Sequence, residues 1–62
     1  MEKEIKHAYK VACDLISFGC DFQKFMELYV AKDIEHRMPG MCKKIWQKAE
    51  RNWRNEMQIY YA

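Results

Sequence analysis

Apolar and polar residues recur along this 62-residue chain with the period of an α-helix. Apolar side chains spaced three or four residues apart fall on one face of a helix, where they can be buried together. This spacing predicts helices over residues of about 2–17, 21–36 and 40–60, and no strand signal competes with it. We therefore expect an all-α fold, a compact three-helix bundle that forms a single helical domain over residues 1–62.

Residues with strong positional preferences mark the ends of these helices. Gly19 follows the first apolar stretch and suits a C-terminal cap, because glycine readily adopts the left-handed conformation found there. Asp21 suits the N-cap of the second helix, since its side chain can accept hydrogen bonds from free backbone N–H groups. Pro39 disfavours helix at Met38 and suits the first turn of the third helix.

The same spacing identifies the faces that the first two helices bury. The apolar stripe of the first helix contains Ile5, Ala8, Tyr9, Ala12, Leu15 and Ile16. The stripe of the second helix contains Phe22, Phe25, Met26 and Tyr29. It decays early, because Asp33 falls back onto the apolar side. Three aromatic residues are central to their stripes and are expected in the core, namely Tyr9, Tyr29 and Trp53.

The third helix places its apolar residues on one side and most of its positive charge on the other. Its apolar stripe contains Cys42, Ile45, Trp46, Ala49, Trp53, Met57 and Tyr60. Its opposite face contains Lys43, Lys44, Gln47, Lys48, Arg51, Arg54, Asn55 and Gln58, with no carboxylate among them. The formal net charge of the whole chain is only +2, so this positive charge is clustered. A clustered basic face attracts acidic side chains or phosphates.

We interpret the third helix as the contact surface for a larger protein. The residues expected to bind this partner are Lys43, Lys44, Trp46, Gln47, Lys48, Arg51, Arg54 and Met57. The charges would provide complementarity and faster encounter, while Trp46 and Met57, at the margin of the apolar stripe, would serve as anchors. A chain of this size suits a non-enzymatic inhibitor or adaptor that acts stoichiometrically, of the kind that phages and mobile elements encode.

A nucleic-acid-binding regulator is the alternative hypothesis. The second helix, a turn and a basic third helix follow one another in the order of a helix-turn-helix. The side chains that would face the DNA groove are Lys43, Lys44, Gln47, Lys48 and Arg51. Against this hypothesis, the segment from Asp33 to Met38 is longer than a usual turn of about three to four residues and contains no glycine. Bulky Trp46 also lies near the exposed margin of the helix.

We expect neither an enzyme nor a metal or cofactor site. His7, His36 and the cysteines lack the paired spacing of zinc ligands. Ser17 is the only serine, the chain has no threonine, and a bundle this small is not expected to enclose a useful pocket. Asp33 and His36, three residues apart, are interpreted as a local hydrogen-bonded pair or cap.

Cysteine usage and the N-terminal residues indicate a compartment. Cys13, Cys20 and Cys42 are an odd number without paired motif spacing, which favours a reducing cytoplasm over a secreted disulfide framework. The charged start, residues 1–4, does not resemble a signal peptide, and no apolar run approaches the ~20 residues of a membrane span. We therefore expect a cytoplasmic protein without membrane contact.

The size of the chain makes association with another molecule an expected source of stability. A domain this small buries only ~60% of the surface that its unfolded chain exposes. The end of the third helix is expected to project past the bundle and to offer apolar residues for a homo-oligomer contact. These residues are Met57, Ile59, Tyr60 and Tyr61.

Overall fold

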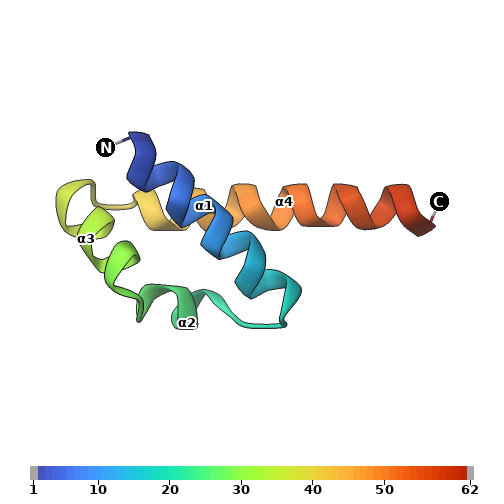
Figure 1. Ribbon diagram of the computed structural model, residues 1–62, viewed down its shortest axis with the longest axis horizontal. Coiled ribbons are helices and arrows are strands. Elements are labelled where there is room, and N and C mark those ends of the chain that lie inside the picture. The colour runs from blue at the N-terminus through green and yellow to red at the C-terminus, as the bar shows by residue number, and fades with distance from the viewer. Residues whose placement is uncertain (1, 62) are drawn as a thin grey trace.

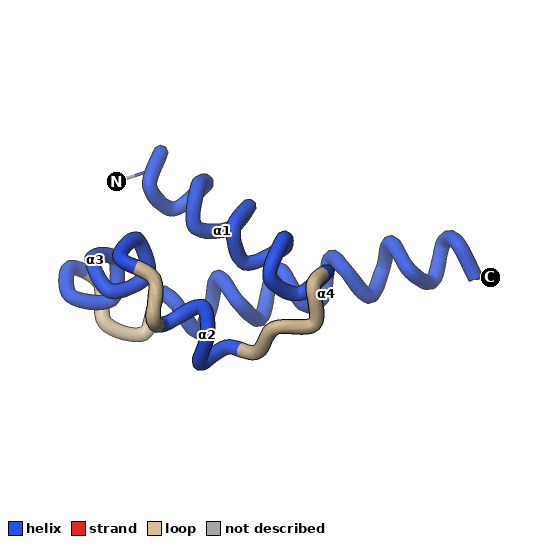
Figure 2. The backbone as a smooth tube through the Cα atoms, turned by 60° about the horizontal axis from the view of Figure 1, so that its bottom comes forward, coloured by secondary structure: helices blue, strands red, loops and turns tan. Residues whose placement is uncertain are grey.

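The computed structural model describes the backbone of residues 2–61 and the side chains of residues 2–55. Within this range the chain forms the four helices α1 (Glu2–Ser17), α2 (Phe22–Met26), α3 (Tyr29–Arg37) and α4 (Met41–Tyr61). Helices α1 and α4 pack across each other and run in the same general direction, with α2 and α3 to one side of them (Figure 1). Short loops connect the helices (Figure 2). The all-α prediction is confirmed.

The prediction of one helix over residues 21–36 is wrong, because the chain divides this segment into α2 and α3. Leu28 adopts an extended conformation between them, with φ −77° and ψ 147°. On one continuous helix, Phe25 and Ile34 would point about 180° apart, so they could not share one buried face. With the break, Phe25, Ala31 and Ile34 are all fully buried. The bundle in the described residues therefore has four helices rather than three.

The C-terminal end of α1 has the hydrogen bonds of a glycine-terminated helix. The N–H of Gly19 donates to the carbonyl of Ile16 (3.0 Å), and the N–H of Cys20 donates to the carbonyl of Leu15 (2.9 Å). This pair of bonds is the Schellman motif. Gly19 has a φ of 83°, in the left-handed region that glycine adopts without a steric penalty. The predicted C-terminal cap is confirmed.

We expect Gly19→Ala to lower the free energy of unfolding by about 1 kcal/mol, because a non-glycine residue is strained in the left-handed region. A Cβ atom at this position would have no heavy atom within 4 Å, so a clash would not contribute. Urea denaturation followed by circular dichroism measures the change. Gln23→Ala, at an exposed position of α2, is the control, with an expected change within about 0.5 kcal/mol. An unchanged Gly19→Ala midpoint would contradict the described end of α1.

The starts of α2 and α4 are also fixed by local interactions. The carboxylate of Asp21 accepts a hydrogen bond from the N–H of Lys24 (3.0 Å), so the predicted N-cap is confirmed. A loop of only three residues, 38–40, joins α3 to α4. In this loop Gly40 has a φ of 88°, and its N–H donates to the carboxylate of Glu35 (2.8 Å). Met38 lies outside the helices, as predicted, but Pro39 lies in the loop and not in the first turn of α4, which begins at Met41; that expectation is wrong.

The core forms where α1 and α4 pack together and where α2 and α3 close over them. Its buried residues are Ala8, Ala12, Phe25, Ala31, Ile34, Cys42, Ile45, Trp46 and Ala49. Four of these are alanines, and small side chains at buried positions let helices approach closely. Phe25 and Trp46 are the two aromatic residues of this set. The ring centroid of Trp46 lies 5.5 Å from that of Phe25 and 5.9 Å from that of Phe22.

Helix α4 is 21 residues long, and its C-terminal part extends beyond the other helices (Figure 1). The expected projection is thus present in the backbone. The side chains of Met57, Ile59, Tyr60 and Tyr61 lie outside the described residues, so the homo-oligomer contact stays a prediction. No helix within residues 2–61 combines the length and the apolar character needed to span a membrane.

Candidate binding surface of α1 and α4

The polar residues predicted to bind a partner are on the exposed face of α4. The exposed members are Lys43, Lys44, Gln47, Lys48, Arg51 and Arg54. Half-buried Glu50 joins Gln47 and the two arginines around a shallow hollow of about 410 Å³. The expectation of a basic face without a carboxylate is therefore corrected, because the side chain of Glu50 reaches the edge of this face.

Trp46 does not lie at an exposed margin, which corrects its expected place as an anchor for a partner. Its exposed fraction is 7%, and its ring packs against Phe22 and Phe25. A projection of α4 alone places Trp46 at the margin of the apolar stripe, but α2 covers this margin in the fold. Met57, the second expected anchor, lies outside the described residues.

The aromatic residues expected in the core are less buried than their stripes indicated. Tyr9 and Trp53 are half-buried, and Tyr29 is 84% exposed. Tyr29 follows the break at Leu28, so it no longer continues the face that carries Phe25. The expectation for Tyr29 is wrong for the same reason that the single second helix is wrong.

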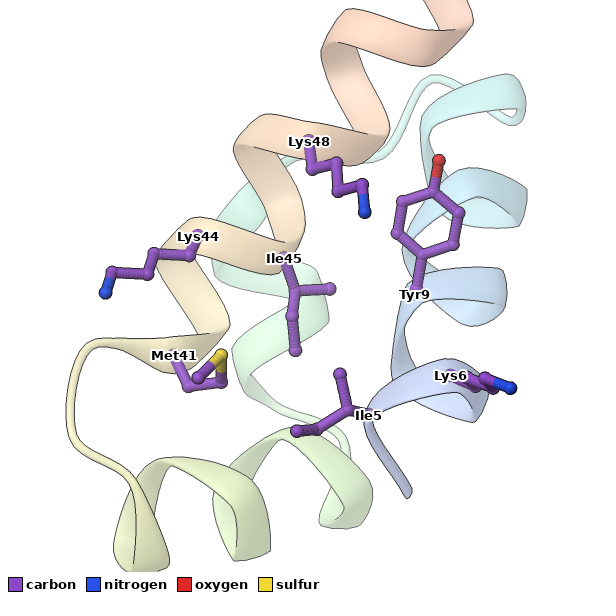
Figure 3. A pocket seen from close by; sticks show the side chains of 7 residues that line it. All are labelled: Ile5, Lys6, Tyr9, Met41, Lys44, Ile45 and Lys48. Atoms are coloured by element: carbon purple, nitrogen blue, oxygen red, sulfur yellow. The ribbon is translucent and has the colours of Figure 1, made fainter. Parts of the chain in front are cut away.

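An apolar groove of about 340 Å³ lies between α1 and α4. Its floor consists of Ile5 and Tyr9 from α1 and of Met41 and Ile45 from α4. In Figure 3 the side chains of Ile5, Met41 and Ile45 point toward one another, and the Tyr9 ring lies farther along α1. Ile45 is buried, whereas the other three are only half-buried and keep apolar surface in contact with solvent. The sequence-based expectation of no useful pocket rested on the small size of the bundle. Ile5 and Ile45 lie on the predicted apolar stripes. How far they are covered depends on how α1 and α4 cross.

Three lysines complete the lining of this groove, which has no Asp or Glu among its seven residues. Lys6 comes from α1, and Lys44 and Lys48 come from α4, so positive charge flanks the floor on both sides. In Figure 3, Lys44 and Lys6 extend outward on opposite sides, while Lys48 extends toward Tyr9. Lys44 and Lys48 were among the predicted residues. Lys6 was missed, since the first helix carries a mixture of charges and gives no signal for it.

Tyr9 connects the two helices at one end of the groove. The Nζ atom of Lys48 lies 5.7 Å from the centroid of the Tyr9 ring, and Nδ2 of Asn52 donates a hydrogen bond to the Tyr9 hydroxyl. A cation–π contact at an exposed site contributes about 0.5–1 kcal/mol. An exposed ion pair contributes about 0.2–1 kcal/mol, so a carboxylate in the groove could compete with the ring for Lys48.

Two expectations from the sequence concern a metal site and a local pair of Asp33 with His36. The described residues contain no cluster of three or more His, Cys, Asp or Glu side chains that could hold a metal ion. The expected pairing of Asp33 with His36 is wrong, because Oδ1 of Asp33 lies 3.5 Å from Nε of Arg37 instead. This pair is one helical turn apart and stabilises α3 locally.

Cys42 is a buried structural thiol. Its Sγ atom donates a hydrogen bond to the carbonyl of Ala31 (3.0 Å), which links α4 to α3. Burial, together with the nearby carboxylate of Glu35, raises the pKa of Cys42 to about 11. The thiol is therefore protonated at neutral pH, and a protonated, buried thiol is a poor nucleophile.

Comparison with known proteins found no matching protein family, no matching curated protein and no matching solved structure. The function is therefore inferred from the groove and from the exposed cations of α4.

Proposed function

We propose that this chain is a small non-enzymatic binding protein that acts stoichiometrically on a larger protein, as an inhibitor or adaptor. The observation that carries the proposal is the apolar groove between α1 and α4, with its lysine rim. Protein interfaces combine an apolar centre with a polar border, and their strongest contacts fill pockets at the centre. In this proposal the groove replaces Trp46 as the apolar part of the contact.

The exposed cations of α4 extend the same surface beyond the groove. Lys43, Gln47 and Arg51 lie on the exposed side of the helix that carries Lys44 and Lys48. Charges at the rim of an interface act mainly by speeding association and by selecting a partner of opposite charge. The proposed partner is therefore acidic where it meets α4.

Photo-crosslinking from α4 tests this proposal. A photoreactive amino acid at Gln47, expressed in the organism that encodes the chain, is expected to give one discrete crosslinked protein, in a complex with one copy of each chain. The same amino acid at Gln23, exposed on α2, is the matched control and is expected to give no such product. Equal crosslinking from both positions, or crosslinking of Gln47 to nucleic acid, would contradict the proposal.

The length of the loop between α3 and α4 favours the helix-turn-helix hypothesis as the second candidate function. The loop between α3 and α4 has three residues and includes Gly40, so the two objections raised from the length and composition of the turn no longer apply. Under this alternative, Lys44, Lys48 and Arg51 contact phosphates. Binding of labelled duplex DNA that weakens steeply with salt, and whose salt dependence flattens in Lys48→Ala, would favour it.

A further inference from the structure

We infer that the groove between α1 and α4 receives an acidic amphipathic helix of the protein partner. This inference rests on the proposed function and names the chemistry of the partner segment. Apolar side chains of that helix contact the half-buried floor residues Ile5, Tyr9 and Met41. Its carboxylates pair with the lysines on the two sides of the floor.

The arrangement of charge around the floor selects this kind of ligand. Lys6 lies on one side of the floor, and Lys44 and Lys48 lie on the other. Lys44 and Lys48 are one helical turn, or about 6 Å, apart along α4. A ligand that pairs with all three lysines must have an apolar stripe with negative charge along both of its edges. An amphipathic helix with acidic flanks has this form, and such helices dock in apolar grooves through residues one turn apart. A fatty acid has only one carboxylate at one end.

Most of the side chains that line the groove are exposed enough to contact a helix of the partner. The floor residues Ile5, Tyr9 and Met41 are half-buried, so they retain apolar surface that a partner can cover. Lys44 is exposed, and Lys48 is held over the Tyr9 ring at 5.7 Å, close to the place where a carboxylate would arrive. No lining residue is acidic, so no carboxylate of the lining repels the ligand.

The inference is tested with a designed, fluorescein-labelled helical peptide that carries Leu at one-turn spacing and Glu on both flanks. Fluorescence anisotropy is expected to show saturable binding of one peptide per chain. NMR is expected to place the largest methyl shifts at Ile5 and Met41. Two control peptides, one with Lys in place of every Glu and one with Ser in place of every Leu, are expected to bind at least about tenfold more weakly.

Charge reversals separate the groove from the positive charge of the rest of the chain. Lys44→Glu combined with Lys48→Glu is expected to weaken the Leu/Glu peptide by about tenfold, because two rim contacts become repulsive. Lys10→Glu combined with Lys32→Glu, at exposed positions of α1 and α3 that do not line the groove, is the matched double control and is expected to change the affinity by less than about threefold. On α1, Lys6→Glu changes a residue that lines the groove and is expected to weaken binding of the peptide. Lys10→Glu, at an exposed position that does not line the groove, is its single-charge control.

A steric variant tests the floor independently of charge. Ile5→Trp is expected to fill part of the groove and to abolish peptide binding, while circular dichroism confirms that the variant remains helical. If this variant unfolds, the lysine reversals still decide the question, since their side chains are exposed.

Each contrary result has a distinct meaning. Equal binding of the Ser-substituted peptide, or an equal effect of the Lys44→Glu/Lys48→Glu and Lys10→Glu/Lys32→Glu variants, would overturn the groove as the site. A wild-type dimer that Ile5→Trp converts to a monomer would assign the groove to a second copy of the chain. Preferential binding of duplex DNA at Lys44 and Lys48 would assign the lysines to phosphates.

If Gln47 still crosslinks to a protein in the Lys44→Glu/Lys48→Glu variant, the proposed function stands and this inference fails. If the Leu/Glu peptide binds but Gln47 captures no protein, the proposed function fails instead.

Discussion

Trp46→Ala is expected to leave the chain largely unfolded at room temperature. Removing a buried tryptophan costs about 3–5 kcal/mol, and the core of a domain this small rarely supplies more than about 3–5 kcal/mol in total. The loss of stability is large because Trp46 is only 7% exposed. Its ring packs against Phe22 and Phe25, and these contacts join α4 to α2. Far-UV circular dichroism and the urea midpoint measure the effect.

Two further variants make this expectation specific to the aromatic cluster. Trp46→Phe keeps a ring in the cluster and is expected to retain most of the helical signal. Trp53→Ala removes a half-buried ring from the same helix and is expected to cost about 1 kcal/mol, the typical value for a single substitution. A fully folded Trp46→Ala protein that no longer crosslinks its partner from Gln47 would instead identify Trp46 as an exposed anchor.

Alkaline conditions are expected to destabilise the protein through Cys42. Its pKa is raised from the ordinary value of 9.0 to about 11 in the folded state. Between these two values the unfolded chain has lost the thiol proton while the folded chain still holds it. The free energy of unfolding therefore falls as pH rises through this window, by at most about 1.4 kcal/mol per pH unit, and is unaffected by this group below pH 9.

Comparison with Cys42→Ser isolates this contribution from the tyrosines and lysines that also titrate at high pH. The serine hydroxyl keeps a donor for the Ala31 carbonyl but does not ionise in this range. Urea denaturation of both proteins from pH 8 to pH 10.5 is expected to show the wild type losing stability relative to Cys42→Ser above pH 9. Parallel curves would mean that the thiol is solvated in the folded state.

The parts of the fold that were predictable from sequence are those set by neighbouring residues. Gly19, Asp21 and the proline at 39 act through their own backbone or through bonds to residues a few positions away, and each marks a helix end as expected. The break at Leu28 was not predictable in this way. It is required by the burial of Phe25 and Ile34 on the same core, which is a tertiary constraint.

The candidate site was predictable only in part, for a similar reason. The exposed cations of α4 follow from the helical period of one segment, so Lys44 and Lys48 were identified. Lys6, Ile5 and Met41 acquire their place only when α1 crosses α4, and no single-helix pattern contains that information. Trp46 fails as an anchor because the neighbouring α2 covers a position that α4 alone would expose.

The buried alanines have a consequence for how the groove could change during evolution. Ala8 and Ala12 on α1 and Ala49 on α4 are fully buried between packed helices, yet none of them lines the groove. Their small volume acts as a spacer that sets the separation of the two helices. A change of a single methyl group at one of these positions would alter the width of the groove while every residue that lines it stays the same. Selectivity for the partner could therefore be retuned from inside the core.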